Sequence, residues 1–322
     1  MSNQSPFVSV VIPVFNEGEN VPLLYDGLKR ALADRGHGWE LIFVNDGSTD
    51  DSLKVLADLA HKDISVKYIV LTRNFGQQAA LTAGMDYAKG NYIITMDCDL
   101  QDPPELVPAM IEKAVEGYDV VFARRNFRDE GFFKRTTASL YYKLLEKFSD
   151  TEVYGNIGDF RLITRKVLVQ LKGMREKSRY LRGMVTWLGF KHAILDYDRP
   201  KRIHGTTGFS LLKMVRLGMA GILSFSLLPI RFGLVVGLMS IFSGIAFLAY
   251  ITYDTFINDE VYQLYKWLRV VTFVFIGFMF ILIWILAEYV GQIYNESKNR
   301  PIYVIEQKEN FEHEFEDTYT QL

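Results

Sequence analysis

Residues 8–17 read VSVVIPVFNE, and this stretch sets the pattern from which the fold of the first part of the chain can be predicted. Its β-branched apolar run is typical of a buried strand, and a polar turn follows directly. Four similar runs follow: ELIFVN (40–45), VKYIVLT (66–72), YIITM (92–96) and DVVFA (119–123). Amphipathic stretches at residues 21–33, 51–61, 77–88 and 104–115 predict helices between them. This alternation predicts an α/β domain with a mostly parallel sheet and helices on both faces.

The segments that follow the predicted strands are the candidate binding site. In open parallel sheets, ligands bind beyond the carboxyl ends of the strands. Residues 13–17, 45–50, 73–77 and 97–101 each come directly after a predicted strand. We therefore expect these four segments to meet at one edge of the sheet.

An acidic cluster follows the fourth predicted strand, where residues 96–105 read MDCDLQDPPE. Strand alternation would point Asp97, Asp99 and Gln101 to one side and Cys98 to the other. Crowded carboxylates repel each other unless a cation lies between them, and their hard oxygen atoms suit Mg²⁺ or Mn²⁺. The pattern predicts a metal–diphosphate site. A solvated acidic turn that caps the next helix is the alternative.

Two further turns carry groups that a nucleotide needs. Glu17 can accept hydrogen bonds from a base or a ribose, and Asp46 can bind a ribose hydroxyl or a base N–H. The alternative for residues 45–51 is a turn in which Thr49 or Asp50 caps a helix. The sequence contains neither G-x-G-x-x-G nor G-x-x-x-x-G-K-[ST], so it lacks the fingerprints of a dinucleotide fold and of a P-loop.

The second part of the chain is more apolar than the first. Residues 232–253 and 270–287 contain no charged side chain, and each run predicts a membrane-spanning helix, with a buried helical hairpin as the alternative. Residues 211–228 have apolar positions at helical spacing and two early cations. They predict either a helix in the membrane interface or one packed on the α/β domain. The formal net charge of −2 gives no nucleic-acid signature.

The distribution of charge predicts the topology. Basic residues flank the two apolar runs on their outer sides, whereas the loop between them is poorer in them. The N-terminal residues lack a basic region before an apolar stretch, so we expect no cleavable signal peptide, and Cys98, the single cysteine, suits a reducing compartment. We therefore expect both termini in the cytoplasm and four regions: a cytosolic α/β domain (1–209), juxtamembrane helices (210–230), a transmembrane hairpin (231–292) and a cytosolic tail (293–322). Gly233 and Gly237 form a G-x-x-x-G that hints at a homo-oligomer.

Five motifs, in this order, resemble glycosyltransferase family 2, in its subgroup of polyprenyl-phosphate sugar transferases. They are PVFNE, VNDGSTD, TRNFGQQAALTAG, DCDLQDPPE and GDFRLITRK. The resemblance covers about residues 8–209, and the two apolar runs after it resemble the bacterial bactoprenol glucosyltransferases, with dolichol-phosphate mannose synthases more distant. It implies a GT-A fold and a UDP-type or GDP-type sugar donor.

The resemblance also implies roles for individual residues. The nucleoside pocket would be lined by Pro13, Phe15, Glu17 and Asp46, with Arg73 and Gln77 beside the base or the phosphates. Asp97, Asp99 and Gln101 match the metal-binding D-x-D-x-Q of the family, and Asp97 and Asp99 would also contact the nucleotide sugar. The acceptor phosphate would meet Arg124, Arg135 and Ser139, although both arginines could instead be surface residues.

One motif departs from the family. Relatives carry R-x-x-G-x-S-K-Y before the membrane segment, whereas residues 202–209 here read RIHGTTGF, with Gly208 in place of the lysine. A phosphate contact is therefore missing, while Arg202 remains to hold the diphosphate or the acceptor. Asp159 is the family-like candidate for a general base, or else it orients the acceptor or the sugar.

The expected reaction is metal-dependent, inverting transfer of a hexose to a polyprenyl phosphate in the bacterial inner membrane. The resemblance favours glucose from UDP-glucose and undecaprenyl phosphate, with mannose or an amino sugar as alternatives. Catalysis would use Arg124, Asp159 and Arg202. Two other hypotheses are a processive polysaccharide synthase, whose acceptor motif residues 263–267 (QLYKW) match poorly, and a non-catalytic nucleotide sensor.

Overall fold

The computed structural model describes residues 8–33, 38–126, 157–177, 179–198 and 261–311, and short helical pieces between residues 239 and 257. The chain divides into two compact units. The first comprises Met1–Glu146, Thr151–Ser210 and Arg300–Leu322, and the second comprises Lys147–Asp150 and Leu211–Asn299. The C-terminal segment thus belongs to the unit that contains the N-terminal strands.

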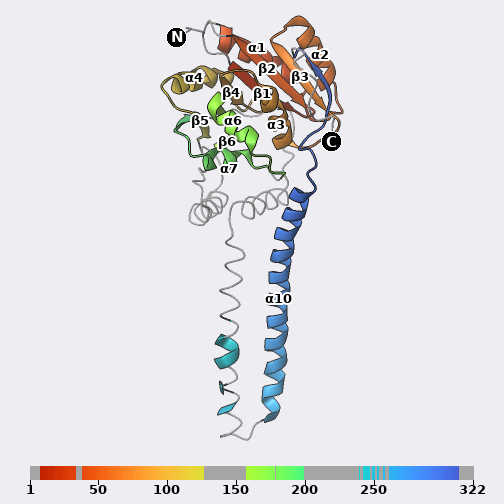
Figure 1. The fold of residues 1–322 in the computed structure, drawn as a ribbon, viewed down its shortest axis with the longest axis vertical. Coiled ribbons are helices and arrows are strands. Elements are labelled where there is room, and N and C mark those ends of the chain that lie inside the picture. The colour runs from red at the N-terminus through yellow and green to blue at the C-terminus, as the bar shows by residue number, and fades with distance from the viewer. Residues whose placement is uncertain are drawn as a thin grey trace. The chain divides into compact units, whose positions relative to one another are not determined.

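The first unit is built on an eight-stranded sheet within the described residues, in the order β7-β5-β6-β4-β1-β2-β3-β8 (Figure 1). The strands are β1 (Val8–Val14), β2 (Trp39–Asn45), β3 (Val66–Leu71), β4 (Tyr92–Thr95), β5 (Val120–Arg125), β6 (Ile157–Thr164), β7 (His192–Tyr197) and β8 (Ile305–Glu309). Strands β4, β1, β2 and β3 are parallel to one another, and β5 is parallel to β7. Because β6 is antiparallel to both β4 and β5, strands β5 and β7 run in the same direction as β1–β4. The predicted mostly parallel sheet is confirmed.

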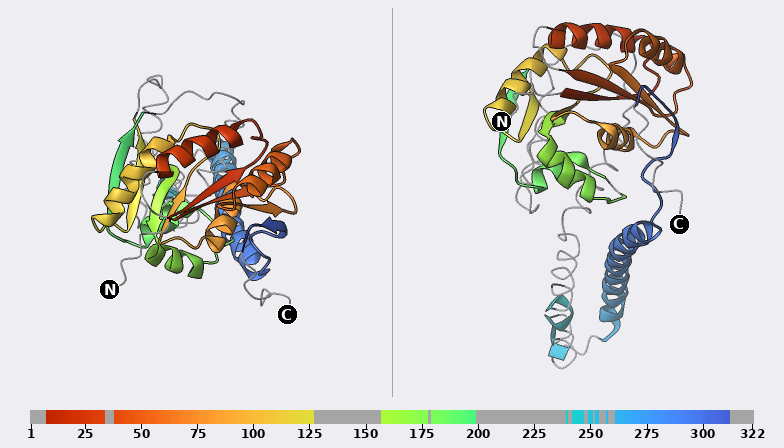
Figure 2. Two further views of the ribbon diagram at one scale, coloured as in Figure 1. Left: turned by 90° about the horizontal axis from the view of Figure 1, so that it is seen from above. Right: turned by 45° about the horizontal axis from the view of Figure 1, so that its top comes forward.

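Helices cover both faces of the sheet (Figure 2). One face carries α1 (Asn20–Ala33), α2 (Ser52–Lys62) and α4 (Val107–Val115), the last preceded by the 3-10 turn η1 (Pro104–Leu106). The other face carries α3 (Gln77–Tyr87), α6 (Arg165–Gly173) and α7 (Leu181–Trp187). Helix α3 approaches the strands closely, because a Cβ on Gly84 would lie 2.3 Å from Cγ1 of Val11.

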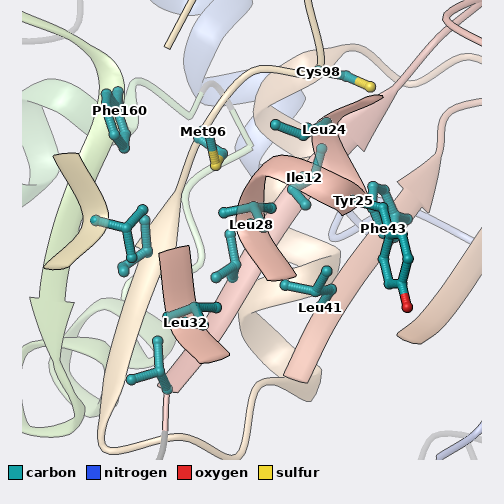
Figure 3. Close-up of a cluster of buried hydrophobic side chains, with 14 of the residues drawn as sticks. Ile12, Leu24, Tyr25, Leu28, Leu32, Leu41, Phe43, Met96, Cys98 and Phe160 are labelled. Atoms are coloured by element: carbon teal, nitrogen blue, oxygen red, sulfur yellow. The ribbon is translucent and has the colours of Figure 1, made fainter. Parts of the chain in front are cut away.

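The packing of α1 shows how apolar spacing builds this core. Leu24, Leu28 and Leu32 recur every four residues on one helix face and are buried. Figure 3 shows them in the same cluster as Ile12 of β1 and Phe43 of β2. Burial of one such side chain contributes about 1.5–3 kcal/mol. This core supports the strands whose carboxyl ends carry the candidate site.

The predicted strands and helices up to residue 125 are confirmed, with ends shifted by one or two residues, except that the helix predicted to begin at residue 104 starts with the 3-10 turn η1 and becomes α4 only at Val107. The elements β6, α6, α7 and β7 were not predicted. β6 carries Asp159 and Arg161 inside its run, so its sequence does not resemble an apolar buried strand, although both side chains are buried. The candidate site residues Arg135, Ser139 and Arg202 lie outside the described residues, as do Gly208, Gly233 and Gly237.

Part of the segment after residue 300 joins the sheet of the first unit. β8 pairs antiparallel with β3, and the side-chain amide of Asn310 donates to the carbonyls of Ala60 and Val66, each at 2.8 Å. The ring of Phe311 packs edge-on against Tyr87. Residues 305–311 therefore lie at the edge of the sheet, beside β3.

The second unit contains the long helix α10 (Val261–Ser297), 37 residues in length. Its stretch Phe275–Ser297 is long and apolar enough to cross a membrane, and the mean hydropathy of an 18-residue window there reaches 1.9. Lys266 and Arg269, which precede the second apolar run, lie within α10. The other predicted span, residues 232–253, lies mostly outside the described residues.

Candidate active site

The loops after β1 and β2 are hydrogen-bonded to each other at the carboxyl edge of the sheet. The backbone N–H of Asn16 donates to Oγ of Ser48 at 3.0 Å, and the N–H of Thr49 donates to Oδ1 of Asn16 at 2.8 Å. Asn16 adopts a left-handed conformation, with φ of 56°, which asparagine tolerates better than most residues. The loops therefore form one connected surface beyond the two strands.

The predicted nucleoside residues differ in exposure within this surface. Pro13 lies in β1 itself, and Phe15, just after the strand, is 46% exposed. The carboxylate of Glu17 accepts the side-chain N–H of Asn20 at 2.5 Å, at the start of α1. The ring of Phe15 is thus accessible to a ligand, whereas the carboxylate of Glu17 already accepts a hydrogen bond from Asn20.

Asp46 connects the end of β2 to the loop that precedes α3. Its buried carboxylate accepts the backbone N–H of Phe75 at 2.7 Å and that of Gly76 at 2.8 Å. Burial raises the pKa of Asp46, and these two hydrogen bonds and Arg73 oppose the rise. Asp46 therefore fixes the position of the loop that carries two other predicted residues, Arg73 and Gln77.

The loop before α3 depends on Gly47 as well. Gly47 has a φ of +70°, and a Cβ there would lie 2.7 Å from the backbone of Arg73. The guanidinium of Arg73 stacks over the ring of Phe75 at 4.2 Å. At the start of α3, the side-chain amide of Gln77 donates to Oδ1 of Asp97 at 2.6 Å. The second and third predicted segments are thus joined to the acidic cluster.

The acidic cluster forms a turn, not the continuation of a strand. Strand β4 ends at Thr95, and Leu100 has a φ of 60°. The prediction that strand alternation orients Asp97, Asp99 and Gln101 was therefore wrong, because these residues lie beyond the end of the strand. The backbone N–H of Gln101 instead donates to Oδ1 of Asp99 at 3.1 Å, which closes a local turn.

The electrostatics of this turn favour the uptake of a positive charge. Burial and, to a smaller extent, the carboxylates of Asp102, Asp159 and Asp99 together raise the pKa of Asp97 to about 8, against the opposing effect of Arg125. Asp102 is completely buried behind the turn, and sequence reasoning had not singled it out. Carboxyl groups whose pKa is raised by burial and by neighbouring like charges are typical of a functional site.

The carboxylate of Asp159 lies buried between two arginines. It accepts the guanidinium of Arg161 at 2.6 Å and that of Arg182 at 3.0 Å, and the amide of Gln78 donates to it at 3.2 Å. Burial opposes ionisation, yet Arg182 and Arg161 hold the pKa of Asp159 below its usual value. Asp159 is therefore a permanent anion near neutral pH. Neither arginine was predicted: Arg161 lies in β6, which was not predicted as a strand, and Arg182 reaches Asp159 only because α7 packs on β6.

Arg124 lies at the end of β5 with its side chain 44% exposed. Its guanidinium forms a two-pronged ion pair with Asp196 of β7, with N···O distances of 2.6 and 2.9 Å. The next residue, Arg125, turns towards the acidic turn, where its Nη2 lies 3.9 Å from Oδ2 of Asp97. The two adjacent arginines thus contact different groups: Arg124 pairs with Asp196 of β7, and Arg125 lies beside the acidic turn.

The residues present fit a divalent cation only in part. Asp97 and Asp99 supply the hard carboxylate oxygens that Mg²⁺ and Mn²⁺ prefer. No group of three His, Cys, Asp or Glu side chains that could hold a metal occurs among the residues that the structure describes. A cation at this turn would therefore need further ligands, such as the oxygens of a diphosphate or water.

Comparison with known proteins gives matches along most of the chain. Residues 9–171 match the family model described as glycosyl transferase family 2. The chain is 40% identical over 301 residues to a prophage bactoprenol glucosyl transferase homolog of Escherichia coli (strain K12), covering 92% of this chain and 98% of that protein. It is 38% identical over 299 residues to the bactoprenol glucosyl transferase of Shigella phage SfV, covering 92% and 97%. Among solved structures, a glucosyl-3-phosphoglycerate synthase from Mycobacterium tuberculosis with Mn²⁺ and UDP-glucose matches with a TM-score of 0.46 and 17% identity, covering 68% of this chain and 77% of that one.

Proposed function

The chain belongs to glycosyl transferase family 2, and from this premise we propose that it transfers one glucose from UDP-glucose to a polyprenyl phosphate such as undecaprenyl phosphate. The observation that carries the proposal is the extent of the match. Relatives named bactoprenol glucosyl transferase align over 92% of this chain, well beyond the residues that match the family model. The similarity therefore includes the apolar C-terminal part and not only the sugar-transferase domain.

The apolar helix α10 supports a membrane location for the acceptor. We propose two membrane spans, with the catalytic domain and both termini in the cytoplasm of a bacterial cell. Nucleotide sugars are cytosolic, and a lipid phosphate lies in the headgroup plane. A membrane-anchored transferase can therefore reach both substrates.

The proposed donor site is the carboxyl edge of β1–β4. Phe15 would contact the base, and the carboxylates of Glu17 and Asp46 would bind the nucleoside. Pro13, Arg73 and Gln77 complete this set of contacts. Asp97, Asp99 and Gln101 would hold Mg²⁺ or Mn²⁺ together with the diphosphate. When bound, the cation would stabilise the negative charge that develops on the departing UDP.

The reaction would be a single displacement with inversion at the anomeric carbon. The lipid phosphate oxygen is already anionic, so the reaction needs alignment and charge stabilisation more than a general base. The ionised state of Asp159 between Arg161 and Arg182 agrees with an orienting role. We propose that this ion cluster fixes the wall of the site against which the sugar or the acceptor is aligned.

A transfer assay tests the proposal directly. The purified full-length chain is incubated with undecaprenyl phosphate and with UDP-glucose, UDP-N-acetylglucosamine or GDP-mannose, and the lipid product is identified by mass spectrometry. We expect one hexose per lipid phosphate from UDP-glucose and no product in the presence of a chelator. A polymeric product would favour a polysaccharide synthase, and failure of every donor to modify the lipid would refute the proposal.

Arg124 is proposed to bind the acceptor phosphate, and its removal should weaken the use of the lipid selectively. We expect Arg124→Ala to raise the KM for undecaprenyl phosphate about tenfold, as expected for the loss of a hydrogen bond to a charged group. The KM for the sugar donor should stay unchanged. The melting temperature should also change little, because exposed ion pairs contribute about 0–1 kcal/mol.

The partner of Arg124 provides the matched control. Asp196→Ala breaks the same ion pair but leaves the cation in place. This variant should keep the wild-type KM for the lipid. Equal lipid KM values in wild type and Arg124→Ala would remove Arg124 from the acceptor site.

A further inference from the structure

Behind the acidic turn lies a buried network of Asp102, Arg125 and Tyr197 to which the proposed reaction assigns no task. Asp102 is fully buried, and its Oδ2 accepts the backbone N–H of Asp97 at 3.1 Å. Its Oδ1 accepts the hydroxyl of Tyr197 at 2.8 Å and Nη2 of Arg125 at 3.4 Å. Both oxygens of one carboxylate are thus used to hold the turn against strands β5 and β7.

Tyr197 connects the members of this network. It is the register partner of Arg125 at the end of the β5–β7 pair, and its hydroxyl accepts Nε of Arg125 at 2.9 Å while it donates to Asp102. Its ring packs edge-on against Phe160 of β6, with the ring centroids 5.9 Å apart. Because Tyr197 is part of the sheet, its hydroxyl fixes the carboxylate of Asp102, which in turn holds the acidic turn.

The network fixes Asp97 before any ligand arrives. The backbone of Asp97 is held by Asp102, and its side chain is held by Gln77 at 2.6 Å. Arg125 lies near both carboxylates, 3.4 Å from Asp102 and 3.9 Å from Asp97, so it offsets their mutual repulsion. Groups that orient metal ligands in this manner commonly change metal affinity when they are altered.

We propose that Tyr197 and Asp102 are positioning residues that hold Asp97 in the orientation required to bind the divalent cation of the sugar donor. This inference rests on the proposed metal-dependent function. The end of β7 lies about a hundred residues after the acidic turn in the sequence. The proposal means that a residue there changes the affinity for the cation by holding Asp97.

A Mn²⁺ titration of the full-length protein in the presence of UDP tests the proposal without turnover. Electron paramagnetic resonance of free Mn²⁺ gives both the number of sites and their dissociation constant. We expect Tyr197→Phe, which removes only the hydroxyl, to bind Mn²⁺ about fivefold more weakly, as the loss of one hydrogen bond predicts. Asp102→Asn should weaken binding by about 10-fold to 100-fold, in the range seen when supporting groups of a metal site are changed.

Tyr303→Phe is the matched control. The hydroxyl of Tyr303 also donates to an aspartate, Oδ2 of Asp86, at the same distance of 2.8 Å. Asp86 lies near the end of α3 that is remote from Gln77. The control therefore loses the same kind of hydrogen bond without changing the turn, and its Mn²⁺ dissociation constant should equal that of wild type.

The two readouts separate the outcomes. Partial unfolding lowers the number of Mn²⁺ sites, whereas loss of positioning raises the dissociation constant. If wild type binds Mn²⁺ and Tyr197→Phe and Asp102→Asn both keep its dissociation constant, the positioning role is wrong and the proposed function stands. If wild type with UDP binds no Mn²⁺, the metal assignment of the proposed function itself fails.

Discussion

Replacement of Asp99 with asparagine is expected to reduce sugar transfer about a thousandfold, which corresponds to about 4 kcal/mol of lost transition-state stabilisation. The reason is the loss of one of the two carboxylates proposed to hold the cation on the departing diphosphate. Asparagine keeps an oxygen at Oδ1, the atom that accepts the backbone N–H of Gln101 and closes the turn. The fold should therefore survive while the charge is lost.

The measurement is the rate of hexose transfer to undecaprenyl phosphate at saturating UDP-glucose, with the melting temperature measured in parallel. Asp58→Asn, an exposed carboxylate on α2, controls for the removal of one negative charge. The control should keep the wild-type rate. If Asp99→Asn also turned over at a wild-type rate, the metal assignment at the acidic turn would be abandoned.

The sequence predicted those parts of the site whose signals are local. Apolar runs followed by polar turns placed Phe15, Asp46 and Asp97 beyond the ends of three strands, and the parallel sheet brings those ends to one edge. The rule that ligands bind there needs only the direction of the strands. The register and the order of the strands were not needed for this inference.

The parts that the sequence did not predict depend on long-range contacts. Arg182 and Tyr197 belong to short elements of mixed apolar and polar sequence, and they reach Asp159 and Asp102 only through the packing of α7 and β7. Asp102 stands before two prolines and resembles a helix cap, although its carboxylate is fully buried. Local pattern therefore identified the groups proposed to contact substrate but not those that hold them.

The C-terminal strand shows a second limit of local pattern. β8 reads IEQKE, a charged sequence without the alternation of a half-buried strand, and its central residues are exposed. It is an edge strand that pairs with β3, and charged side chains are common at such edges. Because its pairing is set by contacts such as those of Asn310 with Ala60 and Val66, no short window of sequence identifies it.

Asp159→Asn is expected to lower the free energy of unfolding of the first unit by about 3–5 kcal/mol, and its melting temperature by about 10 °C. The variant leaves the buried guanidinium of Arg161 and that of Arg182 without the anion between them. Arg182→Gln should cost less. It removes the cation whose side chain is 37% exposed, and Asp159 keeps its bond to Arg161.

The pH dependence of this difference follows from the sign of the pKa shift. Although burial opposes ionisation, Arg182 and Arg161 hold the pKa of Asp159 below the value of 3.8 for an ordinary aspartate. A lowered pKa in the folded state contributes stability that is present above the unfolded pKa and is lost as the pH falls through the folded pKa. The difference in melting temperature between wild type and Asp159→Asn should therefore be present at pH 5 to 7 and shrink once the pH falls below about 3.8.

The same shift separates an orienting anion from a general base. A base that accepts a proton during turnover works best with a pKa near the working pH, and this environment lowers the pKa of Asp159 instead. The transfer rate of wild type should accordingly show no ionisation of Asp159 between pH 5 and 8. If Asp159→Asn were as stable as wild type, the ion-cluster role would be wrong. If the transfer rate of wild type fell at the acid side between pH 5 and 8, and this fall disappeared in Asp159→Asn, the general-base role would be restored.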